Sequence, residues 1–356
     1  MSIHLLVPGL LWPAATAFSP VAGLVLPGLE RVLGLGRRRI EAFRPFELQL
    51  AELFGCVAGG GSDGDPPPLP LAALRRAGED LPMPAGDAHW LCADPVTLSF
   101  AREHMLLSEV PAGHFSQADA DALLSALNET FADLGVFEAC SPTRWYLRAH
   151  TAPDVRLYPL QDVVGRPVKH FLPEGRDARL WQRTMNEAQI VLHNHPLNRA
   201  REEADLPVVN SLWLWGAGEF SRSPRAPAAA IQTRDPILRG LARACGLEAQ
   251  APALASALQA DTLVLIDSLQ QPALQRDVDA WREALQVLES EWFAPLAATL
   301  GSGRLDRLEL SAPSDRGTLE LQARAAERWK FWRKPYTFET LLKSLAPAPG
   351  AEGSGQ

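Results

Sequence analysis

The sequence predicts a mixed α/β protein with two structural units. Its 356 residues exceed the size of most single hydrophobic cores. Strand-like and helix-like segments alternate after residue 207, which indicates a mostly parallel sheet with helices on its faces. We expect residues 1–60 and 205–345 to form this discontinuous α/β core. Residues 75–204 contain two strands, a helix, a strand and a helix, which is typical of an α+β domain inserted into the core.

The composition fits a globular protein and excludes some partners. Hydrophobic residues make up 47% and charged residues 21%, and the net charge of −8 gives no general attraction to nucleic acid or anionic membranes. The four cysteines form no CxxC pair, which fits reduced thiols better than a disulfide or zinc framework. The apolar N-terminal region is interrupted by prolines, so we expect a cytoplasmic protein that does not enter the membrane.

The first 70 residues predict one strand, helical material and a linker. IHLLVPG is a short apolar run that ends at a Pro-Gly turn, as a buried strand does, and we expect it to join the core sheet. PGLERVLGLGRRRIEAFRPFELQLAELFGC indicates helix interrupted by glycines and Pro45. GGGSDGDPPPLP, residues 59–70, has the composition of a linker.

The middle region predicts the elements of the inserted domain. AHWLCADPVTLSF and HMLLSEV indicate paired strands, and TRWYLRAH indicates a third. SQADADALLSALNETFADLG indicates a helix with Ser116 as its N-cap and Gly135 as its stop. RDARLWQRTMNEAQIVLHNHP indicates a second helix, ended by Pro196.

The last 150 residues predict the rest of the core. VVNSLWLWG, AAAIQT, TLVLID, RLDRLEL and GTLELQAR indicate strands, and DPILRGLARACG indicates a helix. One long helix is expected from Pro272 to Gly301, with an apolar stripe of Leu274, Val278, Trp281, Leu285, Leu288 and Trp292. Residues 346–356 are expected to be a disordered tail.

VVNSLWLWGAGEF combines a strand that is apolar on both faces with a glycine turn. Trp213 and Trp215 share one side of the strand, as expected of a strand covered on both faces. Gly216 and Gly218 permit a tight turn at the carboxyl end of the strand, where α/β sheets usually bind ligands. The favoured interpretation is that the tryptophans only pack in the core and the glycines only form the turn.

HNHPLNRAR is the most polar cluster of the middle region. His193 and His195 could ligate a metal, but no third ligand stands at a usual spacing, so capping of a helix end is the favoured interpretation and no metal is expected. Asn198, Arg199 and Arg201 could bind a phosphate or carboxylate, because arginine matches these oxyanions. The favoured interpretation is a polar connection that forms ion pairs with Glu202 and Glu203.

Two further segments raise functional questions. RWKFWRKPY interleaves basic and aromatic residues and could bind single-stranded nucleic acid or a partner, although the same aromatics could instead complete the core. Its candidate residues are Arg328, Trp329, Lys330, Trp332, Arg333 and Lys334. Ser62 is the candidate nucleophile, but a flexible Gly-Ser linker holds a nucleophile poorly.

HNHPLNRAREEADLPVVNSLWLWGAGEF resembles a segment of the archaeal-type cofactor-independent phosphoglycerate mutases, at the end of their inserted cap domain. The matching residues in this sequence are His195, Pro196, Asn198, Arg199, Pro207, Asn210, Gly216 and Gly218. Residues 86–100 are similar to the strand that opens the same cap. The order of ADPVTL, SPTRWYLR, DVVGR, NEAQIVLHNHPLNRAR and NSLWLWG resembles the related RpfE-type regulatory proteins over residues 85–220.

The resemblance implies an alkaline-phosphatase-like core with an inserted cap, and a site for two metal ions held by aspartates and histidines. The sequence departs from that metal site. Pro8 follows the first strand, Gln271 and Gln275 stand where an Asp and a His are expected, and Arg316 follows Asp315. Neutral amides are poor ligands for such a site, and Asp267 and Asp315 alone cannot replace a full set. Ser62 falls near the place of the family's nucleophile.

Three functions therefore compete. The first is a non-catalytic regulatory protein, without a cofactor, that binds an unidentified protein partner or a small anionic ligand. The second is a phosphoglycerate mutase-like enzyme with an altered site built from Ser62, His193, His195 and nearby arginines. The third is an accessory nucleic-acid-binding protein that uses RWKFWRKPY.

Overall fold

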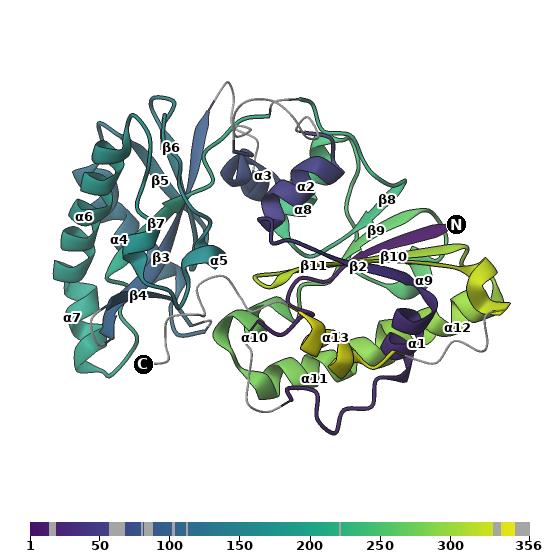
Figure 1. Ribbon diagram of the computed structural model, residues 1–356. Coiled ribbons are helices and arrows are strands. Elements are labelled where there is room, and N and C mark those ends of the chain that lie inside the picture. The colour runs from purple at the N-terminus through teal and green to yellow at the C-terminus, as the bar shows by residue number, and fades with distance from the viewer. Residues whose placement is uncertain are drawn as a thin grey trace. The chain divides into compact units, whose positions relative to one another are not determined.

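The computed structural model describes residues 1–13, 19–56, 68–79, 81, 88–101, 104–111, 113–220, 222–329 and 336–345. The chain forms two compact units (Figure 1). Unit 1 comprises Met1–Phe54, Arg225–Asp235 and Ala242–Gln356, and unit 2 comprises Gly55–Pro224 and Pro236–Leu241. No helix in the described ranges is long and apolar enough to cross a membrane.

Unit 1 is built on a six-stranded sheet with the order β2-β11-β10-β1-β9-β8. Strand β1 pairs in parallel with β10 and β9, and β8 pairs in parallel with β9, whereas β11 is antiparallel to both β10 and β2. The expected entry of the N-terminal strand into this sheet is confirmed. The bounds are β1 (Ser2–Leu6), β2 (Arg37–Glu41), β8 (Ala230–Gln232), β9 (Thr262–Leu265), β10 (Arg307–Ser314) and β11 (Gly317–Arg324).

One face of this sheet is apolar and is covered by helices, as Figure 1 shows. Alternate residues of the strands point into the core, among them Ile3, Leu5, Leu308 and Leu310, which are all fully buried. The covering helices are α1 (Pro27–Leu35), α11 (Val278–Leu288), α12 (Ala294–Ser302) and α13 (Phe338–Ser344). Burial of these apolar side chains supplies the main stabilisation of unit 1.

Helix α1 begins against a buried carboxylate. Glu289 accepts hydrogen bonds from the backbone N–H groups of Gly28 (2.6 Å) and Leu29 (3.0 Å). This carboxylate satisfies amides of the first turn that have no partner inside the helix and offsets the positive end of the helix dipole. Gly28 also permits close packing, because a Cβ there would lie 2.3 Å from the backbone nitrogen of Ala294.

The prediction of one long helix between Pro272 and Gly301 is wrong, because this segment is divided into several elements. Helix α10 (Gln270–Gln275) ends at Arg276, whose φ of 57° is left-handed. Helix α11 follows, then a π-helical turn, η2 (Glu289–Phe293), and then α12, whose C-cap is Gly303 rather than Gly301. Asp277 starts α11 by accepting a bond from the amide of Ala280, so a cap residue inside the apolar pattern begins a new helix.

The segment RRRIE was also interpreted wrongly, since it forms the edge strand β2 rather than helix. Gly36 ends α1 in an extended conformation, and the following residues pair with β11. Charged residues are common on edge strands, where they oppose pairing with other chains. Helix α2 (Phe46–Leu53) then follows as expected.

Unit 2 is built on a five-stranded antiparallel sheet in which β3 pairs with β4, β6 and β7. The expected pairing of the first two strands is confirmed. The bounds are β3 (His89–Ala101), β4 (His104–Glu109), β5 (Gly135–Ser141), β6 (Arg144–Ala149) and β7 (Ser211–Trp215). Helices α4 (Gln117–Thr130) and α6 (Ala178–Asn194) pack on this sheet with apolar faces that include Leu123, Leu127, Trp181 and Leu192.

The predicted caps of unit 2 are largely correct. Ser116 caps α4 in a capping box with Asp119, in which each side chain bonds the backbone amide of the other residue. The expected stop at Gly135 is wrong, because α4 ends at Thr130 and Gly135 opens β5. Pro196 follows the end of α6 as predicted and begins α7 (Pro196–Glu203).

The placement of the tryptophan strand in the core sheet is wrong. Strand β7 pairs antiparallel with β3, with Trp215 opposite Cys92, and therefore lies in unit 2. It can bury both faces there because α6 packs on β7 and α3 (Leu71–Gly78) packs on the adjacent β3. The sequence predicted burial correctly but could not say which sheet provides it.

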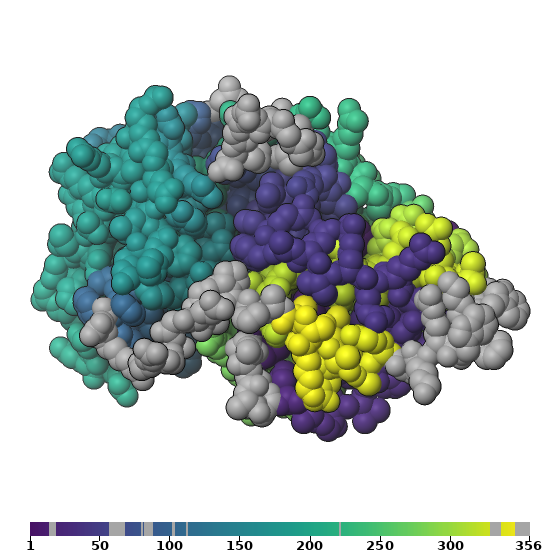
Figure 2. All heavy atoms as spheres, in the orientation of Figure 1, coloured from purple at the N-terminus to yellow at the C-terminus, as the bar shows by residue number. Residues whose placement is uncertain are grey.

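Helix α13, near the end of the described chain, packs beside α1 in unit 1. Figure 2 shows the yellow atoms of α13 beside purple atoms of the N-terminal segment. The backbone carbonyl of Glu30 accepts a hydrogen bond from the amide of Tyr336, and its side chain accepts one from the amide of Phe338.

The remaining elements are α5 (Leu160–Val163), η1 (Val168–His170), α8 (Pro236–Ala244), α9 (Leu254–Ala257) and η3 (Ala325–Trp329).

Candidate functional site

The HNHPLNRAR segment, at the junction of α6 and α7, is mostly occupied with structural contacts. His195 accepts a bond from the amide of Leu197 and so caps α7. Asn198 is buried, donates to the carbonyls of Leu192 and Val209, and accepts from the amide of Val209. These bonds fix the start of the strand that leads to Trp215.

The arginines of this segment have different surroundings. Arg201 is buried, and its guanidinium donates to the carbonyls of Pro207 and His114 and pairs with Asp119 at 3.3 Å. His193 and Arg199 are exposed to solvent. Within the described residues no group of three His, Cys, Asp or Glu side chains could hold a metal ion.

Asn210, Gly216 and Gly218 also serve the fold of unit 2. The Asn210 side chain donates to the carbonyl of Leu98 and accepts from its amide, as a neighbouring strand would. Gly216 has a φ of 79°, and its carbonyl accepts from the amide of Ala72 at the start of α3. A Cβ at Gly218 would lie 2.1 Å from the carbonyl oxygen of Pro68. The two glycines therefore allow other backbone segments of unit 2 to approach this turn closely. The sequence alone had suggested a ligand site at the same place.

Beside this turn lies a buried ionic cluster that the sequence did not reveal, which we name the Arg75 network. Its members are Arg75 on α3, Asp94 on β3, Tyr146 on β6 and Trp215 on β7. Arg75 donates two bonds of 2.7 Å to the two carboxylate oxygens of Asp94, and its Nε donates to the Tyr146 hydroxyl at 3.0 Å. The indole N–H of Trp215 donates to the same carboxylate at 2.8 Å.

The pKa shifts within the Arg75 network favour a charged Arg75 and a neutral Tyr146. Burial alone lowers the pKa of Arg75, but the Asp94 carboxylate outweighs it and leaves that pKa well above the usual value. Burial raises the pKa of Tyr146, so its hydroxyl stays neutral. The guanidinium also lies 4.7 Å from the ring centroid of Tyr146 and 5.1 Å from that of Trp215, in cation–π geometry. The network thus joins α3 to three strands and leaves Arg75 and Asp94 paired with each other.

A second group of ion pairs involves Arg76 on α3 and Glu79 at the end of that helix. Arg76 pairs with Glu138 at 2.6 Å and lies over the ring of Trp90, while Glu79 pairs with Arg144. Burial and nearby Glu79 raise the pKa of the Cys140 thiol to about 11, so this thiol is a poor nucleophile at neutral pH.

In unit 1, the expected ligand site of a parallel sheet is at the carboxyl ends of β1, β8, β9 and β10, which we call the carboxyl edge. The chain fills this edge with apolar groups. Trp12 and Trp281 meet edge to face with ring centroids 5.3 Å apart, and Trp281 stacks on Phe338 at 6.5 Å. These three side chains are at most 3% exposed.

The loops at the carboxyl edge pack directly against each other. The indole of Trp281 donates to the carbonyl of Gly9, just beyond β1, at 2.8 Å. Gly9 itself has a φ of 78°, and a Cβ there would lie 2.6 Å from the carbonyl oxygen of Leu269, in the loop after β9. Little space therefore separates the two loops that follow the central parallel strands.

The polar residues singled out at the carboxyl edge do not form one cluster of anionic ligands. Asp267, Gln271 and Gln275 are exposed, and the last two lie on α10. Asp315 and Arg316 form the turn between β10 and β11. The Arg316 guanidinium donates to the carbonyls of Trp12, Leu342 and Leu345, so it links the edge to α13.

The opposite face of the same sheet carries a polar chain across three strands. His4 on β1 bonds Ser311 on β10 at 2.8 Å, and the Ser311 hydroxyl donates to Glu320 on β11 at 2.7 Å. Since Ser311 uses its proton on Glu320, Nε2 of His4 is the donor to Ser311. Burial lowers the pKa of His4 and raises that of Glu320. A hollow of about 360 Å³ adjoins His4, Asp261, Arg307 and Glu309.

Two candidate sites lie outside the described structure. Ser62 and most of the linker fall within residues 57–67, which the structure does not describe. In RWKFWRKPY the structure describes the backbone of Arg328 and Trp329, at the end of η3, and the residue Tyr336, but not Lys330, Trp332, Arg333 or Lys334. The tail at 346–356 is outside the described residues as well.

Comparisons with known proteins find similarity to the phosphoglycerate mutases over part of the chain. The family model of 2,3-bisphosphoglycerate-independent phosphoglycerate mutase matches residues 72–198, from α3 to α7. The mutase of Methanosarcina mazei is 24% identical over 186 residues, 50% of this chain and 45% of the relative. The mutase of Methanothrix thermoacetophila is 28% identical over 120 residues, 34% of this chain and 30% of the relative. These matches thus span less than half of either relative.

A solved structure extends the likeness of fold to the whole chain. The PH0037 protein from Pyrococcus horikoshii has a TM-score of 0.55 and 14% identity, with 96% of this chain and 91% of that chain covered. The protein is therefore of a mixed α/β class shared with that structure. It is related to the archaeal-type cofactor-independent phosphoglycerate mutases. The family match lies in unit 2 and does not extend to the carboxyl edge of unit 1.

Proposed function

We propose that this protein is a non-catalytic, regulatory binding protein that descends from the phosphoglycerate mutase fold. The observation that carries the proposal is the closed carboxyl edge of unit 1, where Trp12, Trp281 and Phe338 fill the usual ligand position of a parallel sheet. A buried aromatic cluster stabilises the fold and carries no charged group that could bind a phosphorylated substrate.

The metal pair implied by the resemblance does not fit the residues at this edge. Two divalent ions held about 4 Å apart need several carboxylates to offset their charge. Pro8 and Gly9 carry no ligand side chain, and Gln271 and Gln275 are neutral. Arg316 places a positive charge beside Asp315, and its guanidinium bonds to backbone carbonyls of the edge. The residues at this edge therefore do not support catalysis by a metal pair.

The proposal places binding, rather than chemistry, in unit 2, which carries the sequence likeness to the mutases. The resemblance to RpfE-type proteins over residues 85–220 supports a regulatory role in the cytoplasm. The Arg75 network and the bonds of Asn198 and Asn210 hold the strands and helices of this unit in fixed positions. A rigid unit of this kind presents a preformed surface to a protein partner or a small anionic ligand at low entropic cost.

An enzyme assay tests the proposal. The full chain, supplied with manganese, is given 3-phosphoglycerate, and formation of 2-phosphoglycerate is followed with a coupled assay. We expect no turnover above that of a Ser62→Ala variant. Turnover that requires manganese and disappears in Ser62→Ala would contradict the proposal and establish an enzyme with an altered site.

A further inference from the structure

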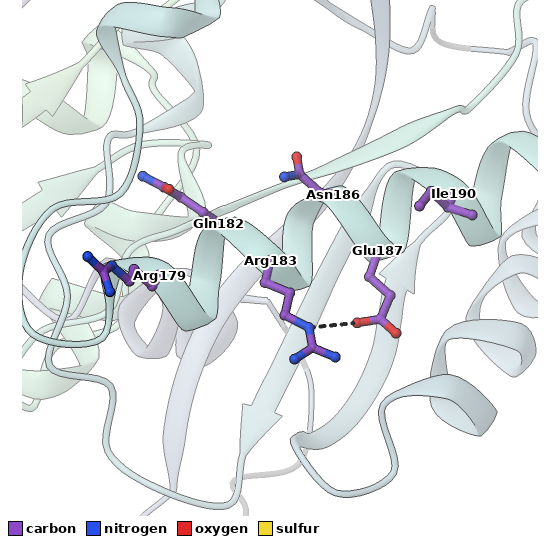
Figure 3. Close-up of a pocket in the computed structure, with 6 residues that line it drawn as sticks. All are labelled: Arg179, Gln182, Arg183, Asn186, Glu187 and Ile190. Carbon is purple, nitrogen blue, oxygen red and sulfur yellow. Dashed lines mark ion pairs between the residues drawn. The ribbon is translucent and has the colours of Figure 1, made fainter.

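Helix α6 turns one face to the core of unit 2 and leaves the opposite face exposed. Trp181, Thr184, Ala188 and Leu192 form the buried face. A shallow hollow of about 500 Å³ lies along the outer face, and Figure 3 shows the six side chains that line it projecting from α6. Its lining residues all belong to this helix and are Arg179, Gln182, Arg183, Asn186, Glu187 and Ile190.

Two large apolar side chains are exposed at the ends of this outer face. Leu180 is 50% exposed and Ile190 is 63% exposed. The charged residues Arg183 and Glu187 lie between them on the same side of the helix, because the spacings of three, four and three residues follow the helical repeat. These four residues therefore follow the order apolar, basic, acidic, apolar along a face that also carries Arg179, Gln182 and Asn186.

This order is symmetric about one residue. Met185 is five residues from both Leu180 and Ile190, and two residues from both Arg183 and Glu187. Met185 itself packs against the core. An antiparallel copy of the helix, related by a two-fold axis on the outer face at the level of Met185, would place Leu180 against Ile190 and Arg183 against Glu187. Each of these contacts would then occur twice, as in every two-fold symmetric interface.

We propose that the outer face of α6 is a docking surface for a second copy of this chain, which packs antiparallel across that two-fold axis. The pairing covers the exposed Leu180 and Ile190 side chains and joins opposite charges. A parallel arrangement would instead place Arg183 against Arg183 and Glu187 against Glu187, so like charges oppose it.

The ion pair that Arg183 and Glu187 form within one chain does not prevent them from pairing with the second copy instead. Arg183 and Glu187 are 3.8 Å apart, with side chains 81% and 46% exposed. A pair with this exposure contributes little to stability, so both side chains can turn to a partner. Two packed helices form a small interface, and we expect a dimer that dissociates on dilution. The inference does not depend on whether the protein is catalytic.

Charge reversal with mixing tests the proposal. The mass of the full chain is measured by sedimentation or light scattering over an about hundred-fold range of concentration. We expect the wild-type mass to rise from that of a monomer, 38.8 kDa, towards twice that value. Arg183→Glu and Glu187→Arg should each remain monomeric, because each places like charges in contact twice.

Recombination of the two variants gives the sharpest result. An equal mixture of Arg183→Glu and Glu187→Arg should dimerise, since both contacts between positions 183 and 187 then join opposite charges, and the double variant should dimerise alone. Lys343→Glu is the matched control, because Lys343 forms a similar exposed pair with Glu339 on α13. This control should keep the wild-type behaviour. A wild-type chain that stays monomeric, or single reversals that leave the dimer intact, would overturn the proposal.

Cysteine cross-linking checks the orientation. Under a mild oxidant, a mixture of Leu180→Cys and Ile190→Cys chains should form a covalent dimer, whereas neither variant alone should exceed the background of the native cysteines. Cross-linking of Leu180→Cys with itself would indicate parallel helices and would contradict the proposed register. Thermal unfolding of each variant should match that of the wild type, since both positions are exposed.

Discussion

The guanidinium of Arg75 and the carboxylate of Asp94 form two parallel hydrogen bonds of 2.7 Å inside unit 2, where their side chains are 7% and 2% exposed. This pair joins a helix to the longest strand of the unit. Because neither charge reaches solvent, each depends on the other, and the loss of one leaves the other uncompensated.

Removing one partner of this pair should destabilise the protein strongly. We expect Asp94→Ala to lower the free energy of unfolding by about 3–5 kcal/mol, because it leaves the Arg75 charge buried without its partner. Denaturant unfolding measures this change. An exposed ion pair such as Arg183–Glu187 supplies the comparison, and Arg183→Ala should cost less than about 0.5 kcal/mol. Similar losses in the two variants would show that Arg75 has another means of stabilisation.

Trp215 contributes both packing and a hydrogen bond to the Arg75 network. Trp215→Ala should cost about 3–5 kcal/mol, because it opens a cavity in the core. Trp215→Phe retains most of the apolar ring but removes the bond to Asp94, and its cost should be smaller, about 1–3 kcal/mol. Chemical denaturation of both variants gives the two values. A loss well under 1 kcal/mol for the alanine variant would contradict the burial of this side chain.

A comparison of alanine variants at Gly216 and Gly246 distinguishes the cost of backbone strain from the cost of a steric clash. Both have left-handed φ values, 79° and 76°, but a Cβ at Gly216 would lie 2.9 Å from the Ala72 nitrogen, whereas nothing lies within 4 Å of a Cβ at Gly246. Gly246→Ala should therefore cost about 1–2 kcal/mol from strain alone. Gly216→Ala should cost more, since the α3 backbone must move as well. Equal midpoint shifts in thermal unfolding would show that this close approach is not constrained.

His4 should make stability depend on pH. Burial lowers the pKa of His4 in the folded protein; Glu309 raises this pKa by a smaller amount, and Arg307 lowers it further. The unfolded chain therefore binds a proton near pH 6.5 that the folded chain does not. The His4 contribution is fully present above that pH and is lost as pH falls towards the lower folded pKa.

His4→Gln measures this contribution directly. The variant should show a smaller loss of unfolding free energy than the wild type between about pH 7 and pH 5. Their difference in stability should be constant above about pH 7.5, where His4 is neutral in both states, and this range serves as the control. If the plots of unfolding free energy against pH were parallel for the two proteins over the whole range, His4 would have the same pKa in the folded and unfolded states.

Local sequence rules predicted much of the fold because local chemistry determines those features. The N-cap at Ser116, the start of a helix at Pro196 and the alternating burial of the strands follow from side chains a few residues apart. The parallel sheet containing the N-terminal strand was also predicted. Strand β7 was assigned to the wrong sheet because periodicity reports burial but not the identity of the pairing strand.

The candidate site was predicted less well, for a physical reason. Arg75 and Asp94 come together through packing between a helix and a strand, and a spacing of 19 residues carries no motif that reveals it. The polar residues that attracted attention, Asn198 and Asn210, satisfy buried backbone groups, which is a common use of such side chains. An Arg within the apolar start of α3 and an Asp within the apolar β3 were the available signals.

The metal content of the purified full chain tests the central claim most directly. The protein is incubated with manganese or zinc, freed of unbound ions and measured by elemental analysis together with protein concentration. The apolar packing at the carboxyl edge, and the lack of a carboxylate cluster among the residues that the structure describes there, predict well under one metal ion per chain. Two ions per chain, retained after exhaustive dialysis and accompanied by mutase turnover, would contradict a non-catalytic protein.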